Sequence, residues 1–566
     1  MPLLDSFQTV IASAGRQYRA TRKMARTGVT VLTGYSPYVP KHLLIAPQNL
    51  RTSDASLAEE YYAGRYVFAG ELVETKGASP FGFPGAGSDW NRELHSFRWL
   101  QNLSARGDAL SGSHAQAMVR EWMELDAKSP KNVVWDTETA AARLISWLQN
   151  SMLILSVPNY DFHQEFMQNL GSHARYLKRY ASSASSGIPR LMAYLALAYA
   201  SVCFEGRTSR LNFAGSRLDE ELDTQILPDG SHISRNPYAS VEILTYLLPY
   251  RQSIIATGKE PSPSVLASTE RLLHGLRFHR LGDGHLARFN GCGSTETDLV
   301  ATLLRYDESV TNELVNSSSG GYERFESGET ILIFDAGRPP KGTLSNSAHA
   351  GSLSFEFSSG ADCIVVNSGV PVRKRAEIPA QWRSSATHST SVVCDSSSCK
   401  FENTGQTGSL MEGQLFSGPL KLESVRLTDE QYEVVTASHQ GYVREFGIRH
   451  ERTLKMHRQN GCIEGRDWYS GPDKEDLYYT TKDAVTIHFH LHPNVEVEYS
   501  QDGNDILVRS LFGKTWSFSC EEITPEIEDS IYFAGLANPL KTKQITLRFH
   551  ACKNPEINWK FAPLNS

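Results

Sequence analysis

Residues 345–369 read SNSAHAGSLSFEFSSGADCIVVNSG and predict a β-hairpin. Apolar and polar residues alternate from 353 to 358, which is the pattern of a half-buried strand. A Ser-Ser-Gly turn follows, and the apolar run 363–366 predicts the returning strand. A hairpin brings its two ends together, so we expect His349, before the first strand, to lie close to Asn367, after the second. Farther on, His388 precedes another short apolar run.

Three spaced segments around these residues, SAHAGSLSFEF, VVNSG and THSTSVV, resemble the heparinase II/III-like family of polysaccharide lyases. In that family the corresponding segments build one side of the active cleft. The resemblance implies an α+β chain with two domains: an N-terminal incomplete α/α toroid and a C-terminal antiparallel β-sandwich. It also implies an anionic polysaccharide or oligosaccharide as the partner.

The length of 566 residues predicts two domains, because single hydrophobic cores stop growing at ~250–300 residues. The run SSSGG at 317–321 is the best boundary, since helical spacing dominates before it and period-2 alternation after it. We therefore expect a helical domain over 1–315 and a β-sandwich over 320–566. The segment 61–84, rich in glycine and aromatic residues, is expected to be irregular. The helices are expected at 118–125, 137–155, 162–180, 189–204, 219–226, 240–255, 265–276 and 298–305, and the strands at 330–334, 353–357, 363–366, 392–393, 433–437, 442–448, 485–491, 506–511 and 545–550.

The formal net charge is −7, and acidic and basic residues are mixed along the chain. The absence of a basic block argues against nucleic acid as a partner. No apolar run approaches the ~20 residues of a membrane span. The N-terminal 28 residues lack the order of a secretory signal, and the eight cysteines form no CxxC pair. We therefore expect a cytoplasmic protein with reduced thiols, and the oligomeric state stays open.

One loop in the helical half has the composition of a site. Residues 227–238 read LPDGSHISRNPY and place acids, bases and anion donors before an apolar helix. The alternative is an ordinary loop between helices in which Asn236 or Ser240 acts as a cap. The loop resembles a family segment in which a tyrosine serves as acid or base, and Tyr238 matches that tyrosine.

Cleavage of a glycan beside a uronic acid by β-elimination requires a group that neutralises the carboxylate, a base for the C5 proton and an acid for the leaving oxygen. Arg235 and Asn236 suit the first role. His349 or His232 suits the second, and Tyr238 suits the second or the third.

The chain departs from the family at several positions. Known members carry an Asn-His pair at the start of an upstream helix, where this chain offers only Arg190 as a substrate ligand. They often have a histidine where Ser347 stands. Their metal-binding Asp is Asn367 here, and a neutral amide is a poorer zinc ligand than a carboxylate. We therefore expect His349, Asn367 and His388 to keep the geometry of a zinc site with little zinc, and no cofactor to be required.

Two further groups are candidates for binding substrate. His488, His490 and His492 are spaced by two and are expected on one face of a strand, where hydrogen-bonded core histidines are the more common outcome. Tyr322, in the segment entering the β domain, resembles a family residue, with strand packing as the alternative.

The leading hypothesis is a lyase that cleaves uronate-containing glycans by β-elimination. A catalytically weakened glycan-binding protein on the same scaffold is the main alternative. A glycoside hydrolase with paired carboxylates is less favoured, because Glu220, Glu221 and Asp223 fit a solvated helix face. The sugar and the endo or exo mode of cleavage stay open.

Overall fold

The computed structural model describes residues 39–83, 86–125, 133–205, 211–307, 317–371, 380–402, 414–419, 422–477, 482–535 and 539–564. The N-terminal residues used above to argue localisation lie outside these ranges. The described residues form two compact units, one comprising 39–225 and 245–269 and the other comprising 226–244 and 270–564. None of the described helices is long and apolar enough to cross a membrane.

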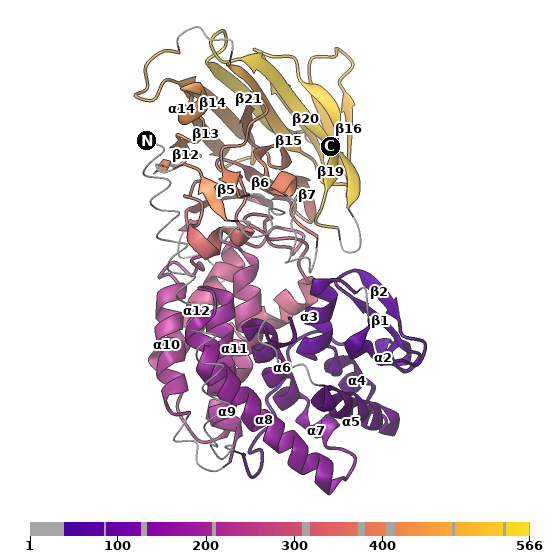
Figure 1. The fold of residues 1–566 in the computed structure, drawn as a ribbon. Coiled ribbons are helices and arrows are strands. Elements are labelled where there is room, and N and C mark those ends of the chain that lie inside the picture. The colour runs from indigo at the N-terminus through magenta and orange to yellow at the C-terminus, as the bar shows by residue number, and fades with distance from the viewer. Residues whose placement is uncertain are drawn as a thin grey trace. The chain divides into compact units, whose positions relative to one another are not determined.

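Helices dominate the chain up to residue 304 (Figure 1). They are α2 Leu57–Tyr62, α3 Ser88–Ser96, α4 Leu100–Arg106, α5 Ala109–Glu124, α6 Thr137–Gln149, α7 Ser151–Ile154, α8 Tyr160–Tyr180, α9 Ile188–Cys203, α10 Phe213–Gln225, α11 Tyr238–Ala256, α12 Pro263–Phe278 and α13 Thr297–Leu304. The expected helices are all present, but α5 begins nine residues and α10 six residues earlier than expected. The segment 137–155 is divided into α6 and α7.

The apolar stripes of these helices pack against one another. In α8, Asn159 caps the first turn by accepting a hydrogen bond from the Phe162 amide at 2.9 Å, and a buried stripe begins at Phe162. Helix α9 is buried almost all round and packs against α6, α8 and α10. A helix that is apolar on every side needs neighbours on every side, which is the arrangement of stacked helix pairs.

The segment 61–84 is not irregular, contrary to the expectation from sequence. Strands β1 Arg65–Phe68 and β2 Glu71–Glu74 form a two-stranded antiparallel hairpin there. Its turn has Ala69 at φ 51° and Gly70 at φ 78°, the conformation of a tight hairpin turn. Aromatic residues of this segment pack on one another and on Trp99, just before α4: the rings of Tyr61 and Tyr66 stack with centroids 5.5 Å apart.

The rest of the chain is antiparallel sheet. The three main sheets have the strand orders β3-β4-β5-β6-β7, β19-β20-β15-β8 and β11-β12-β13-β14-β21-β18-β17-β16. The strands are β3 Ser318–Ser319, β4 Tyr322–Ser327, β5 Thr330–Asp335, β6 Phe355–Ser359, β7 Asp362–Val365, β8 Ser391–Val393, β9 Lys400–Phe401, β10 Leu415–Ser417, β11 Leu422–Thr428, β12 Tyr432–His439, β13 Arg449–His457, β14 Ile463–Ser470, β15 Ala484–His490, β16 Val495–Tyr499, β17 Ile506–Ser510, β18 Thr515–Cys520, β19 Glu526–Tyr532, β20 Leu540–His550 and β21 Glu556–Leu564.

The core of this unit lies between the sheets, as in a sandwich. Phe357 of β6 meets Trp516 of β18 with ring centroids 5.0 Å apart, and Phe489 of β15 meets Trp559 of β21 at 4.8 Å. Apolar residues of all three sheets therefore share one core. The described residues confirm the predicted fold class, a helical region followed by an antiparallel β-sandwich.

One expected strand is a helix. Residues 442–448 contain α14, Val443–Phe446, which ends at Gly447 in the left-handed conformation with φ 69°. The Gly447 amide donates to the Val443 carbonyl at 2.9 Å and closes the turn. The alternation of apolar residues in this short run was too brief to separate a strand from a single helical turn.

Candidate functional site

The hairpin of β6 and β7 forms as predicted, with Phe357 paired to Val365. Strand β6 is buried on both faces, so the expectation of a half-buried strand is wrong. Glu356 consequently lies inside the protein rather than in solvent. A buried carboxylate needs charged or hydrogen-bonding partners, and these partners build the floor of the site.

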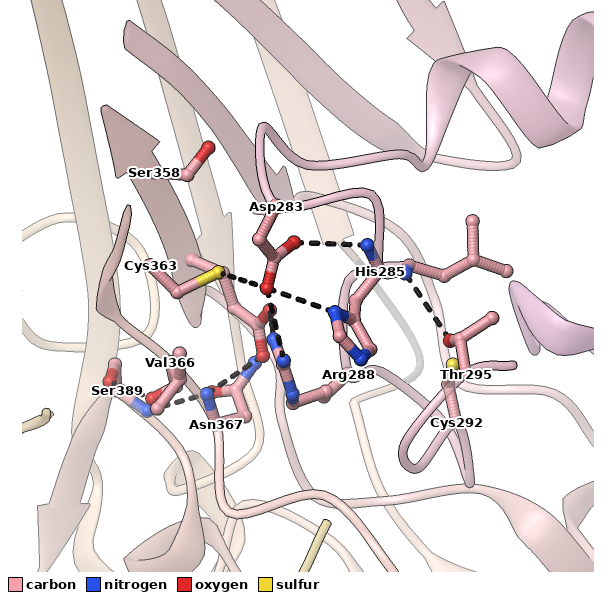
Figure 2. A network of polar contacts seen from close by, with 12 residues as sticks. Asp283, His285, Arg288, Cys292, Thr295, Ser358, Cys363, Val366, Asn367 and Ser389 are labelled. Atoms are coloured by element: carbon pink, nitrogen blue, oxygen red, sulfur yellow. Dashed lines mark hydrogen bonds and ion pairs between the residues drawn. The ribbon is translucent and has the colours of Figure 1, made fainter. Parts of the chain in front are cut away.

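Arg288 is the main partner of Glu356 (Figure 2). Its Nη1 donates to Glu356 Oε2 at 3.2 Å, and its Nη2 lies 3.9 Å from Asp283 Oδ2. Burial opposes ionisation and raises the pKa of Glu356, whereas hydrogen bonding to His285 and the nearby Arg288 charge hold the pKa of Asp283 well below its usual range despite its burial. The Cys363 thiol contacts the same Asp283 oxygen at 3.1 Å.

Asn367 is held by this network. Its amide donates to Glu356 Oε1 at 2.8 Å, and its Oδ1 accepts a hydrogen bond from the Ser389 amide at 2.9 Å (Figure 2). The hairpin end is thereby joined to the segment that carries His388. The side-chain nitrogen of Asn367 has no hydrogen-bond partner within the described residues.

The rings of His349 and His388 contact each other. His349 Nδ1 lies 3.1 Å from His388 Nε2. His388 Nδ1 lies 2.7 Å from the Ser384 carbonyl oxygen, which can only accept, so this nitrogen carries the proton. In the neutral ring His388 Nε2 is then an acceptor, and His349 Nδ1 is its donor.

This chain of hydrogen bonds leaves His349 Nε2 as a lone pair. The atom is buried and has no hydrogen-bond partner within the described residues. Burial keeps both rings neutral: it lowers the pKa of His388 to about 4 and that of His349 well below its ordinary value, helped there by the nearby His388 and Arg383. A neutral imidazole oriented by a second group has the form of a general base.

Asn290, which the sequence analysis did not select, supports His349 from behind. Its Oδ1 accepts from the His349 amide at 3.2 Å and its Nδ2 donates to the Tyr322 hydroxyl at 2.6 Å. Tyr322 is fully buried and donates in turn to the Arg235 carbonyl at 2.6 Å. Tyr322 therefore has the packing role that was its alternative interpretation.

Arg235 is bound within the protein. Its Nη2 forms an ion pair with Asp335, and its other nitrogens donate to the carbonyls of Gly320 and Arg338 at 2.6 and 3.1 Å. Its backbone adopts φ 57°, and a Cβ on Gly337 would lie 2.3 Å from Arg235 Nη2. These contacts favour a structural role over neutralisation of a substrate carboxylate.

The remaining residues of the 227–238 loop divide into two groups. His232 is buried beside Ser234, with 2.7 Å between Nδ1 and Oγ, and desolvation lowers its pKa to about 4. Asn236 and Tyr238 are half-buried at the start of α11, and Asn236 Oδ1 accepts from the Tyr238 amide at 2.9 Å. Asn236 thus makes the capping contact that was the alternative to a catalytic role, while Tyr238 is the most accessible candidate acid.

The three histidines near β15 have different surroundings. His490 is engaged at both nitrogens, Nδ1 with Ser530 Oγ at 2.8 Å and Nε2 with the Ala386 carbonyl at 3.0 Å, which places it beside the His388 segment. His492 lies beyond the end of β15, half-buried against Tyr532. His490 is thus a hydrogen-bonded core histidine. Arg190, in the other compact unit, forms an ion pair with Glu221 at 2.6 Å.

The residues predicted to hold zinc do not make a full ligand set. The facing nitrogens of His349 and His388 are close enough for one ion to contact both, but the third residue is an amide whose Oδ1 already accepts from Ser389. Among the described residues, no carboxylate or thiol joins His349 and His388 to make a set of three metal ligands. Zinc sites in proteins use thiolate, imidazole and carboxylate ligands, so no catalytic step is derived through a metal.

The fold and this site put the chain in the class of proteins that combine a helical toroid with an antiparallel β-sandwich. Two family models match it: heparinase II/III N-terminus over residues 82–254, and heparinase II/III-like, C-terminal, over residues 310–560. The chain belongs to the heparinase II/III-like family, as its hairpin and histidine segments predicted.

Solved structures share the fold. A heparinase III structure superposes with a TM-score of 0.72 at 15% identity, covering 94% of this chain and 88% of that chain. A heparan sulfate lyase from Pedobacter heparinus gives a TM-score of 0.61 at 16% identity, covering 92% and 84%. Among curated proteins, the FtsZ-localized protein C of Caulobacter vibrioides is 26% identical over 533 residues, 92% of this chain and 89% of that protein.

Proposed function

We propose that this protein cleaves a uronate-containing glycan by β-elimination, with His349 as the base and Tyr238 as the acid. The observation that carries the proposal is the hydrogen-bond chain from the Ser384 carbonyl through His388 to His349, which leaves an unprotonated, unpartnered Nε2 on His349. The same chain selects the tautomer and fixes the plane of the ring.

The reaction needs only proton transfers and the stabilisation of charge. His349 Nε2 takes the C5 proton, the electron pair forms the C4–C5 double bond, and the C4–O4 bond breaks as Tyr238 donates its phenolic proton to O4. The half-buried Tyr238 suits the acid role because its body is held at the start of α11. Asn236, whose Oδ1 accepts from the Tyr238 amide, is the candidate donor to the substrate carboxylate through its Nδ2.

A second candidate is a glycan-binding protein without turnover. Two observations favour it: the Nε2 atom of His349 is buried, and Arg235 is paired with Asp335. A relative named for its localisation with FtsZ also suggests a role other than polysaccharide breakdown. In that case the site would retain the lyase scaffold for recognition alone.

The test is an assay of the full chain against a panel of uronate-containing polysaccharides, followed by the ultraviolet absorbance of the new C4–C5 double bond. We expect product from the unmodified protein and rates lower by about 100-fold or more in Tyr238→Phe and His349→Gln, as for the loss of a general acid or base. Tyr160→Phe, at a tyrosine 76% exposed on α8, is the matched control and should keep full activity.

The two candidates separate in the same experiment. Saturable glycan binding without absorbance selects the binding protein, and neither binding nor absorbance rejects both. If Tyr238→Phe keeps full activity, the acid has been assigned to the wrong residue.

A further inference from the structure

The turn between β13 and β14, far along the chain from the site above, gathers three metal-ligating side chains. His457 ends β13, Cys462 precedes β14, and Glu464 follows two residues later on the same face. One ligand atom from each lies within 4.8 Å of the others. Within the described residues, these three side chains are the group of His, Cys, Asp and Glu whose ligand atoms lie close enough together to hold one metal ion.

The backbone that carries these residues is held in place. The His457 amide donates to the Cys462 carbonyl and the Gly461 amide to the His457 carbonyl, both at 2.9 Å. The Asn460 side chain accepts from the Cys462 amide at 3.0 Å. Gly461 has φ 69°, and a Cβ there would lie 2.8 Å from Thr330 Oγ1. The three ligands are therefore positioned before any ion arrives.

The side chains face a common space. His457 Nε2 lies 2.9 Å from Glu464 Oε1, yet this buried nitrogen makes no hydrogen bond of acceptable geometry. Cys462 is buried, with 3% of its surface exposed, whereas the side chains of His457 and Glu464 are 24% and 35% exposed. One ligand atom of each of the three side chains is thus within reach of a single ion.

We propose that His457, Cys462 and Glu464 bind a divalent ion of the zinc class, with a water or an outside ligand in the fourth position. Imidazole, thiolate and carboxylate are the ligands zinc takes in proteins, and three protein ligands leave the site open. Magnesium and calcium are disfavoured because they require oxygen ligands. Binding replaces the thiol proton, which leaves to solvent as the metal–sulfur bond forms.

Two lysines set the affinity. Lys455 Nζ lies 3.2 Å from Glu464 Oε2, and Lys560 Nζ lies 3.8 Å from Glu464 Oε1. Without a metal ion, these ammonium groups neutralise the Glu464 carboxylate. When a metal ion is bound, they repel the ion. Removing one of these lysines should therefore strengthen metal binding. The loss of an ordinary surface ion pair would not have this effect.

The experiment titrates the metal-free full chain with Co²⁺ and follows the near-ultraviolet charge-transfer band of a cobalt–thiolate bond. We expect one equivalent to give the band, Zn²⁺ to displace it, and Cys462→Ser to abolish it. His457→Asn should weaken Co²⁺ binding by about tenfold or more, because one of the three protein ligands is lost. Lys560→Gln should tighten it about three- to tenfold, the Coulomb effect of one charge at this range.

Cys520→Ser is the control, because Cys520, at the end of β18, is also a free thiol that lies beside a glutamate, Glu522. It should leave the band unchanged. The His349, Asn367 and His388 group contains no sulfur, so it cannot produce the band. An absent band in the unmodified protein overturns the proposal, as does a band that survives Cys462→Ser or a weaker affinity in Lys560→Gln.

Discussion

Hydrogen bonds to single side chains decide what the histidines of the candidate site can do. The Ser384 carbonyl determines the tautomer of His388, and His388 determines that of His349. The same segment binds Asn367 through the Ser389 amide. The side chain of Asn367 accepts the hydrogen bond from the Ser389 amide, but it carries no negative charge that could offset the desolvation of a bound ion.

Replacing Asn367 with Asp should create a zinc site. The carboxylate adds the missing charge beside two imidazole nitrogens that already converge at 3.1 Å. In a Cys462→Ser background, which removes the site proposed at the β13–β14 turn, we expect elemental analysis to find about one zinc per chain in Asn367→Asp and little in its parent. Asn169→Asp, which adds the same charge on α8, is the control.

Stoichiometric zinc in the Cys462→Ser parent would contradict this reasoning. An Asn367→Asp protein that folds but takes up no zinc would show that the amide is not the reason for weak binding.

Within the eight-stranded sheet, two paired strands bring one residue of each into very close contact. In the pairing of β14 with β21, Gly465 stands opposite Trp559. A Cβ on Gly465 would lie 2.0 Å from the Trp559 ring. The ring has little freedom to move, because its Nε1 donates to Asp467 Oδ2 at 2.8 Å and its face stacks on Phe355 at 5.4 Å.

Gly465→Ala should therefore destabilise the β-sandwich by about 1–3 kcal/mol or more, the usual effect of overpacking a core. Chemical denaturation followed by tryptophan fluorescence measures it. Gly215→Ala on α10 is the control, because nothing lies within 4 Å of a Cβ there. It should be neutral or stabilising by roughly 0.5–1 kcal/mol, the helix preference for alanine over glycine. Equal stability of Gly465→Ala and the unmodified protein would refute the packing argument.

Across the whole molecule, many histidines are buried in their neutral form. Six lie away from the histidine pair of the candidate site, and burial lowers the pKa of each below its ordinary value: His95, His173, His232, His279, His439 and His450. Burial therefore favours the unprotonated form of each ring in the folded protein.

The stability of the protein should fall steeply as the pH drops below about 6.5, the ordinary histidine pKa. The unfolded chain takes up protons there and the folded chain does not, so each histidine removes about 1.4 kcal/mol per pH unit until its folded pKa is reached. Above about pH 7.5 both states are neutral and the effect disappears. Urea midpoints at pH 7.5, 6.5 and 5.5 measure it.

His42→Gln, at an exposed side chain, is the control variant. A urea midpoint that stays constant from pH 7.5 to 5.5 would rule out the buried neutral histidines as a determinant of stability.

Local patterns in the sequence were sufficient for the order of the two regions, helical first and strand-rich second, but not for every element. The alternation over 353–358 and the apolar run 363–366 predicted a hairpin, and helical spacing before residue 305 predicted the helical region. Such patterns are readable because neighbouring residues repeat with the period of the element they form. The pattern failed at 442–448, where only one helical turn was present.

Tertiary structure alone decided which of the polar residues form the site. The alternation placed Glu356 on the solvent side of its strand, but a second layer covers that side, and Arg288, 68 residues away, neutralises it. The residue type of Arg235 and its place in a polar loop suggested a substrate ligand. In the folded chain its guanidinium instead pairs with Asp335, 100 residues away in the sequence. A side chain's type states which partners it needs, and only the folded chain determines which partner reaches it, because the closest charges are distant in sequence.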